Sequence, residues 1–250
     1  MKNIIMNGCK GRMGKAILEL INKSEDMTLI AGVDSGADGT ESYPAYSSFS
    51  ECPGKGDVVI DFSHHSAVPG VLKFCVENQI PAVIATTALG EEELIAIEEA
   101  AKHIPVFNSF NMSIGINAIA KLMQTLVPIL EKDFNIEIIE KHHNQKKDSP
   151  SGTALLLATS INEACATKKD FVYGRYGKEE ECKITDLGIH AVRGGTIPGE
   201  HTILFAGPDE VIEITHTALS RNIFANGALE AASFLIGKEK GLYSMADLVS

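Results

Sequence analysis

The sequence contains no tryptophan, and aromatic residues make up only 6% of its 250 positions. Basic residues are also scarce, because 22 lysines and arginines stand against 33 aspartates and glutamates and leave a formal net charge of −11. Such an acidic protein binds nucleic acid and anionic membrane surfaces poorly. We therefore expect neither as a partner, and any local cluster of basic residues becomes informative.

Cysteines and long apolar runs are scarce as well. The five cysteines are an odd number, they are scattered, and none forms a C-x-x-C motif, which argues against a disulfide framework and a cysteine-based zinc site. No apolar run approaches the roughly 18 to 20 residues that cross a bilayer. The first residues form a strand pattern rather than a secretory signal. We expect a cytoplasmic protein without a bound metal ion.

The first half of the chain alternates short apolar runs with segments of helical periodicity. This alternation predicts an α/β domain, a Rossmann-like, doubly wound parallel sheet that binds ligands beyond the carboxyl ends of its strands. Residues 35–56 are rich in glycine, serine and proline and predict a long loop around a poor helix. The expected strands are 2–7, 27–33, 57–62, 81–85 and 105–107, and the expected helices are 13–21, 67–78 and 91–102.

The pattern changes after Asn111. An apolar helix over 114–130, bent or stopped near Pro128, precedes expected strands at 135–141, 184–192, 201–205 and 210–216, a helix at 153–164 and an irregular loop over 168–182. This order predicts a C-terminal α+β domain with an open mixed sheet over residues 112–220. A last helix over 221–236 is expected to pack back, so that residues 221–250 complete a first domain of residues 1–111.

Three glycines lie between the first expected strand and the first expected helix, in Gly8-Cys-Lys-Gly11-Arg-Met-Gly14. Glycines at this place let the backbone approach a pyrophosphate at the positive end of a helix. The spacing is G-x-x-G-x-x-G, with Lys10 in place of the middle glycine of the usual dinucleotide motif, so an ordinary glycine turn is the alternative. The position after a strand and before a helix favours a dinucleotide site.

Asp34 ends the second strand about 20 residues beyond the last glycine, where a carboxylate binds the ribose hydroxyls of adenosine. An ordinary strand-end turn is the alternative. Ser35 follows instead of an arginine that would bind a 2′-phosphate, which favours NADH. However, Lys10, Arg12 and Lys15 are nearby cations that leave NADPH open. The loops after the fourth and fifth strands are expected on the nicotinamide side, with Thr86, Thr87, Ser109, Phe110, Asn111 and Met112.

The most informative stretch is a basic turn, residues 140–154. It carries His142, His143 and Lys146 just before a helix that begins near Thr153. The N–H groups of a helix start bind a carboxylate, and protonated histidine or lysine binds a second one and donates a proton. The turn therefore predicts a dianion site. A solvated loop and a metal site are the alternatives, although adjacent histidines on a strand point to opposite faces.

The chain resembles the 4-hydroxy-tetrahydrodipicolinate reductase family, also called dihydrodipicolinate reductases, nearly end to end. The motifs are GCKGRMG at 8–14, DFS at 61–63, ATT at 85–87, NMSIGIN at 111–117, EKHHNQKKDSPSGTA at 140–154, GEHT at 199–202 and EITHTALSRNIFANGAL at 213–229. The resemblance implies a reductase of lysine and diaminopimelate biosynthesis that uses NADH or NADPH. It also implies two-domain subunits that assemble into a homotetramer through the C-terminal domain, which holds the small dicarboxylate substrate.

The resemblance further implies roles for individual positions. His142 corresponds to the proton donor or acceptor, and Lys146 to a second proton donor. The substrate-binding positions are His143, Gly152 and Thr153. The nucleotide-binding positions are Gly8, Cys9, Lys10, Gly11, Arg12, Met13, Asp34, Ala85, Thr86, Thr87, Ser109, Phe110, Asn111 and Met112. Ala85 stands where many members have glycine, which is expected to crowd that loop slightly.

Two other functions fit parts of the pattern. One is a different Rossmann reductase or dehydrogenase acting on another anionic substrate, such as aspartate. The other is a redox-sensing regulator that binds NADH without chemistry, although the net charge of −11 argues against DNA binding. His142 and Lys146 beside a carboxylate-sized site favour a reductase whose domains close on hinges near Asn111 and Ser220.

Overall fold

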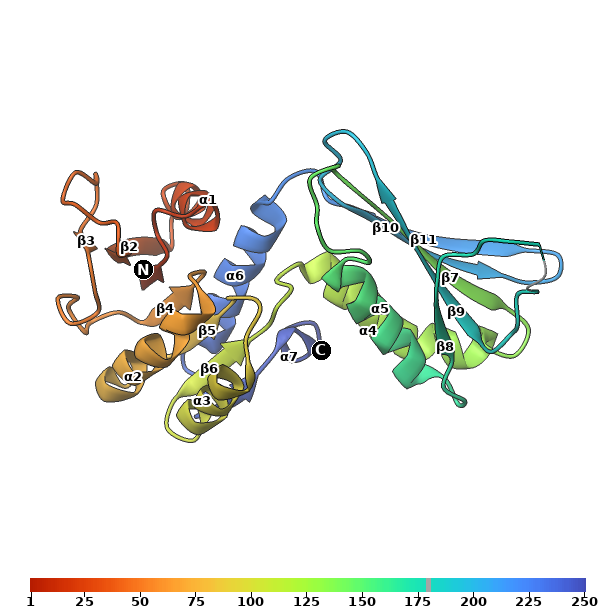
Figure 1. Ribbon diagram of the computed structural model, residues 1–250. Coiled ribbons are helices and arrows are strands. Elements are labelled where there is room, and N and C mark those ends of the chain that lie inside the picture. Colours follow the sequence, from red (N-terminus) through yellow and green to blue (C-terminus); the bar gives the residue numbers. More distant parts are fainter. Residues whose placement is uncertain (179–180) are drawn as a thin grey trace. The chain divides into compact units, whose positions relative to one another are not determined.

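The chain folds into two compact units, and the computed structural model describes residues 1–178 and 181–250. Unit 1 comprises residues 1–114 and 221–250, and unit 2 comprises residues 115–220. Figure 1 shows how α6 (Asn222–Leu235), drawn in blue, returns the chain to the strands of unit 1. Within the described residues, no helix is both long enough and apolar enough to cross a membrane.

Unit 1 is built on a seven-stranded sheet with the order β12-β6-β5-β4-β1-β2-β3. All neighbouring strands in it are parallel. The central strands are apolar runs buried on both faces, as a parallel sheet between two layers of helices requires. The strands are β1 (Lys2–Asn7), β2 (Met27–Val33), β3 (Ala45–Tyr46), β4 (Val58–Asp61), β5 (Ala82–Ile84), β6 (Pro105–Asn108) and β12 (Gly241–Tyr243).

Helices cover both faces of this sheet. α1 (Arg12–Ile21) and α6 pack into one apolar cluster, and α2 (Val68–Asn78) and α3 (Glu91–Ala101) pack into the other. The remaining helical segments are a 3₁₀ turn, η1 (His65–Ala67), before α2, and α7 (Met245–Leu248). The arrangement confirms the predicted Rossmann-like domain. The edge strands β3 and β12 depart from the prediction because their two and three residues are half-buried or exposed and form no buried apolar run.

Unit 2 is an open mixed sheet with two helices on one face. Its order is β11-β10-β7-β9-β8, and β7 is antiparallel to β10 but parallel to β9. Burial alternates along β7, and its buried side chains pack with α4 (Ile114–Leu130) and α5 (Gly152–Ala164). The strands are β7 (Asn135–His142), β8 (Asp170–Tyr173), β9 (Asp186–Arg193), β10 (Glu200–Ala206) and β11 (Val211–Thr217). The predicted α+β domain with a mixed sheet is confirmed.

One local prediction for unit 2 is wrong. The loop expected over residues 168–182 contains β8, which joins the sheet by pairing with β9. Its four residues are exposed or half-buried, so the segment lacks the apolar pattern of an inner strand. Residues 179–180 of the expected loop lie outside the described residues. α4 ends two residues beyond Pro128, in line with the stop expected near that proline.

Candidate active site

The glycine turn of unit 1 leads from β1 into the first turn of α1. Gly8 has a φ of +77°, and a Cβ there would lie 2.5 Å from the carbonyl oxygen of Phe62. Gly11 is the N-cap residue of α1, and no side chain caps the helix at this position. The N–H groups of the first helical turn are therefore left to an anion such as a pyrophosphate.

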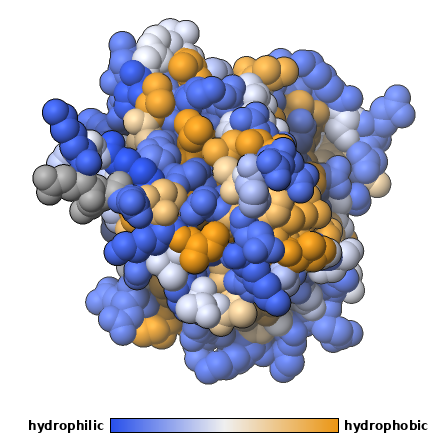
Figure 2. Space-filling view, turned by 90° about the vertical axis from the view of Figure 1, so that its right-hand side faces the viewer, coloured by the Kyte–Doolittle hydropathy of each residue, from blue (hydrophilic) through white to orange (hydrophobic). Residues whose placement is uncertain are grey.

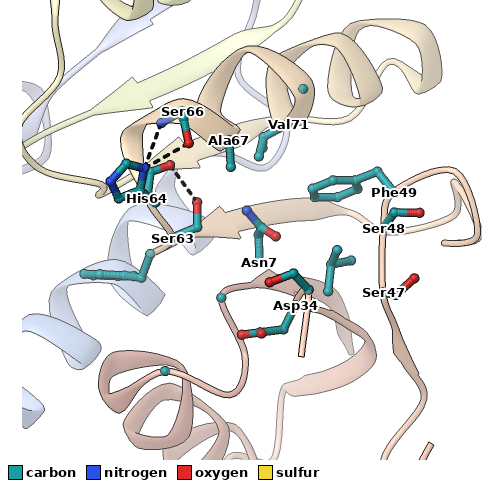
Figure 3. A pocket seen from close by; sticks show the side chains of 16 residues that line it. Asn7, Asp34, Ser47, Ser48, Phe49, Ser63, His64, Ser66, Ala67 and Val71 are labelled. Atoms are coloured by element: carbon teal, nitrogen blue, oxygen red, sulfur yellow. Dashed lines mark hydrogen bonds between the residues drawn. The ribbon is translucent and has the colours of Figure 1, made fainter. Parts of the chain in front are cut away.

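A pocket of about 600 Å³ opens beside this turn. Figure 3 shows Asn7 and Asp34 between Phe49 on one side and His64 on the other. A volume of this size is typical of a small-molecule site. Three of the residues predicted to bind the nucleotide line this pocket: Gly8, Gly11 and Asp34.

A second pocket, of about 480 Å³, adjoins the first because Phe62 and Ser63 line both. It contains most of the other predicted nucleotide-binding residues: Arg12, Met13, Ala85, Thr86, Thr87, Phe110 and Met112. The remaining four line neither of these two pockets. Cys9 is fully buried, the Lys10 side chain contacts acidic residues, and Ser109 Oγ donates to the Asn111 carbonyl at 3.0 Å.

A buried carboxylate ties together the strand ends beneath these pockets. Asp61 is fully buried and accepts hydrogen bonds from Asn7 Nδ2 at 2.7 Å, Thr86 Oγ1 at 2.7 Å and Ser63 Oγ at 2.6 Å. Burial raises the pKa of Asp61, and the three donors oppose that effect. The carboxyl ends of β1, β4 and β5 are thus fixed relative to one another, and with them the floor of the pockets.

Asp34 and Lys10 meet at the end of β2. The Asp34 carboxylate accepts the Lys10 N–H at 3.0 Å and the Gly36 N–H at 3.0 Å. The Lys10 ammonium points to other acids, with Glu41 at 2.8 Å and Asp38 at 3.3 Å. The hydrogen bond to Glu41 raises the pKa of Lys10. Of the three nearby cations, Lys10 is therefore already neutralised by the chain's own carboxylates.

The basic turn of unit 2 lies between β7 and α5. The Lys146 ammonium is 2.9 Å from the Asp148 carboxylate. Burial acts to raise the pKa of Asp148, but Lys146 and the Gly152 N–H outweigh it and lower the pKa. Ser151 caps α5 by accepting the Ala154 N–H at 3.1 Å. One group expected to bind a substrate carboxylate, the Lys146 ammonium, thus contacts a carboxylate of the protein.

His142 is the last residue of β7 and is buried in the same unit. Its Nδ1 lies 2.6 Å from the carboxylate of Glu140, which is fully buried and also paired with Arg193. Burial lowers the pKa of His142, while the hydrogen bond and charge of Glu140 act the other way. His143 follows the end of β7 and is only half-buried, so the two histidines differ in burial.

Sequence reasoning omitted several residues of these sites. Asn7 and Ser63 line the first pocket, and the DFS motif was the signal that could have included Ser63. Glu140 stands within the quoted EKHHNQKK stretch, but a buried acid at a strand end has no distinctive sequence signal. Arg193 comes from β9, and only the pairing of β7 with β9 brings it beside Glu140.

Comparison with known proteins identifies the family. Residues 2–112 match the family model described as dihydrodipicolinate reductase, N-terminus, and residues 115–249 match the model for the C-terminus of the same enzyme. The chain belongs to the dihydrodipicolinate reductase family. It is therefore a member of a family of oxidoreductases, as the motifs predicted.

Two relatives match this dihydrodipicolinate reductase family member along nearly their whole length. A 4-hydroxy-tetrahydrodipicolinate reductase of Caldanaerobacter subterraneus subsp. tengcongensis is 52% identical over 249 residues, covering 100% of this chain and 98% of the relative. One of Clostridium novyi is 45% identical, with the same coverage of both chains.

Solved structures agree on the fold. A dipicolinate-bound dihydrodipicolinate reductase from Paenisporosarcina sp. TG-14 has a TM-score of 0.81 at 24% identity, covering 98% of this chain and 97% of its own. An aspartate dehydrogenase from Thermotoga maritima has a TM-score of 0.53 at 13% identity, covering 96% of this chain and 98% of its own. At these identities the structural similarity speaks for the fold, so the aspartate enzyme shares an architecture with this chain.

Proposed function

We propose that the chain reduces 4-hydroxy-tetrahydrodipicolinate, by way of dihydrodipicolinate, to tetrahydrodipicolinate with NADH or NADPH, in lysine and diaminopimelate biosynthesis. The observation that carries the proposal is the basic turn of unit 2, where the Lys146 ammonium pairs with the carboxylate of Asp148 just before the start of α5. The names of the full-length relatives support the same substrate. In this proposal residues 1–111 and 221–250 bind the dinucleotide, and residues 112–220 bind the substrate.

The residues of unit 1 fit a dinucleotide. The uncapped first turn of α1 suits the pyrophosphate, and Asp34 suits the ribose hydroxyls at the edge of the first pocket. Thr86, Thr87 and Phe110 in the second pocket suit the nicotinamide. When bound, the cofactor supplies a hydride.

We assign the preference to NADH. A 2′-phosphate on the ribose would meet the Asp34 carboxylate, and Lys10 does not offset that charge because Glu41 and Asp38 bind its ammonium. Like charges in contact are unfavourable, so the arrangement favours a free 2′-hydroxyl.

The residues of unit 2 supply charge and protons. Lys146, His143, the Gly152 N–H and Thr153 would bind the ring carboxylates, with Lys146 released from Asp148. Loss of water from the 4-hydroxy compound gives the unsaturated ring. A hydride then adds at ring C4, and the resulting enamine takes a proton at C3. His142 and Lys146 serve that proton transfer, a contribution typically worth about 10² to 10⁴ in rate.

The test is a steady-state assay with substrate made fresh by the preceding synthase. Lys146→Ala should lower kcat by about 10² or more, with the dissociation constant for NADH within about twofold of the unsubstituted protein. Lys147→Ala, at the exposed neighbouring position, is the matched control and should keep full turnover. A variant that loses nucleotide affinity instead would contradict the division of labour between the units.

The wild-type assay separates the proposal from its rivals. The reductase is supported if NADH is oxidised in the presence of 4-hydroxy-tetrahydrodipicolinate and NAD⁺ is not reduced in the presence of aspartate. Binding of NADH without turnover of either substrate would support a sensor instead.

We also propose a homotetramer in the cytoplasm, for which light scattering coupled to gel filtration gives the oligomeric state directly. Figure 2 shows hydrophobic residues lying among hydrophilic ones on the face it presents.

A further inference from the structure

Both carboxylate oxygens of Glu140 have more than one polar partner. Its Oε1 accepts the Ser151 N–H at 3.0 Å and Arg193 Nη2 at 2.8 Å. Its Oε2 accepts Arg193 Nη1 at 2.8 Å and faces His142 Nδ1 at 2.6 Å. A fully buried carboxylate with this set of donors, including a two-pronged guanidinium, is held in one orientation and in its charged form.

The charge state of Glu140 decides which ring nitrogen of His142 carries hydrogen. Burial acts to raise the pKa of Glu140, but the bonds from Arg193, His142 and Ser151 outweigh it and lower the pKa. Because an ionised carboxylate only accepts hydrogen bonds, Nδ1 of His142 must be the donor. Nε2 is then the nitrogen left to gain or lose a proton.

The surroundings of Nε2 fit that role. A Cβ at Gly199 would lie 3.0 Å from it, so the glycine keeps space beside this nitrogen. His201 packs edge-on against the His142 ring, with centroids 5.1 Å apart, and its Nε2 contacts Ser151 Oγ at 2.9 Å. Ser151 in turn donates its N–H to Glu140, which closes a ring of contacts around His142.

We propose that Glu140 is a positioning residue for the reaction: its carboxylate, held by Arg193, keeps His142 in the Nδ1–H tautomer with Nε2 directed to the substrate. The inference deepens the proposed function and rests on it for the identity of the reaction. The same arrangement occurs in other enzymes in which a carboxylate orients a catalytic histidine ring.

The titratable and charged groups around His142 set the direction of the pH effect. They are Glu140 on the same strand, Arg193 on β9, His201 on β10 and Lys146 in the basic turn. Glu140 raises the pKa of His142, and its effect is larger than the opposing effects of Lys146 and Arg193. Removing Glu140 together with Arg193 should therefore move the histidine limb of the pH–rate profile to lower pH.

The test is the double variant Glu140→Gln/Arg193→Met, which removes both charges and leaves neither one buried alone. We expect kcat to fall about 10²-fold, with the dissociation constant for NADH unchanged. In ¹⁵N-labelled protein at about pH 8, His142 should change from the Nδ1–H tautomer to a mixture of both. Glu137→Gln/Arg175→Met is the matched control, because it removes a second Glu–Arg pair, at 2.7 Å, from the opposite face of β7.

Three outcomes would overturn the proposal. One is a folded double variant whose kcat and tautomer match the wild type. Another is the same loss of kcat in the Glu137 control at an unchanged oligomeric state. The third is a wild-type spectrum with His142 as Nε2–H, a readout that also decides the question if the double variant does not fold. The tautomer is measured without substrate. An NMR result that contradicts this inference is therefore distinct from a lack of turnover in the reductase assay, which would contradict the proposed function.

Discussion

Space beside His142 Nε2 depends on a residue without a side chain. Gly199 directly precedes β10. Its carbonyl oxygen accepts the Ala218 N–H at 2.8 Å, which anchors the backbone at this position. A methyl group at this position would press on the imidazole at 3.0 Å.

We therefore expect Gly199→Ala to lower kcat by roughly 10- to 100-fold through displacement of the ring. Nucleotide affinity should not change. Gly194→Ala is the control, since a Cβ at Gly194 meets no atom within 4 Å. Equal kcat values for the two variants in the reductase assay would show that Nε2 has no role in proton transfer.

A second prediction at the level of residues concerns the choice of cofactor. Asp34→Asn keeps one oxygen for the turn but removes the charge that a 2′-phosphate would meet. The ratio of kcat/KM for NADPH to that for NADH should rise about tenfold, the effect of about 1.4 kcal/mol. Asp209→Asn, in the hairpin between β10 and β11, should leave the ratio unchanged. A ratio that already favours NADPH in the wild type would refute the assignment.

Single residues were predictable where a motif fixes their place. Asp34, Gly8 and Gly11 follow from strand–turn–helix spacing, and they line the expected pocket. The state of Lys10 was not predictable, because its partners Asp38 and Glu41 lie in a loop without a regular pattern. Arg193 was not predictable either, since the parallel pairing of β7 and β9 joins residues 53 positions apart.

Among the elements, α6 depends on a close approach of two backbones. Gly227 lies within α6, and a Cβ there would collide with the carbonyl oxygen of Met112. Gly70 lies within α2 and would meet nothing within 4 Å. Alanine substitutions at these two helical glycines therefore distinguish the cost of a steric clash from the ordinary helix propensity of alanine.

Gly227→Ala should lower the free energy of unfolding by about 3 kcal/mol, because the helix has to move away from its neighbour. Gly70→Ala should raise it by about 0.5 to 1 kcal/mol through the lower entropy of the unfolded chain. Urea unfolding of the protein without nucleotide measures both. A mild effect of Gly227→Ala would mean that α6 does not pack against the Met112 segment in solution.

Elements with a buried apolar run or a clear helical period were predictable, and strands that are only half-buried or exposed were not. The central strands of unit 1 and α1, α2 and α3 follow from apolar runs that alternate with helical spacing. The strands β3, β8 and β12 have two to four residues, and their places depend on a neighbouring strand rather than on their own sequence.

For the molecule as a whole, a buried histidine links stability to pH. His201 is 5% exposed, and burial, followed by the charge of His142, lowers its pKa to about 4. In the unfolded chain a histidine titrates near pH 6.5. The unfolded state therefore binds the extra proton as the pH falls from about 6.5 to 4, and stability is lost over that window.

The expected loss from this group alone is about 3 kcal/mol between those limits. His201→Gln should remove that part of the pH dependence while retaining a partner for Ser151 Oγ. His103→Gln, at an exposed position, should behave as the wild type does. Urea unfolding at several pH values between 4 and 7 gives the slopes, and parallel slopes for all three proteins would refute the role of His201.

The two-part composition of unit 1 has a consequence for biosynthesis. β12 pairs with β6, and α6 covers one face of a sheet whose other strands precede unit 2 in the sequence. A ribosome therefore releases all of unit 2 before it releases the pieces that finish the Rossmann sheet. One apolar face of the nascent N-terminal strands therefore stays uncovered while residues 115–220 are synthesised. Chaperones can bind the exposed strands during that interval.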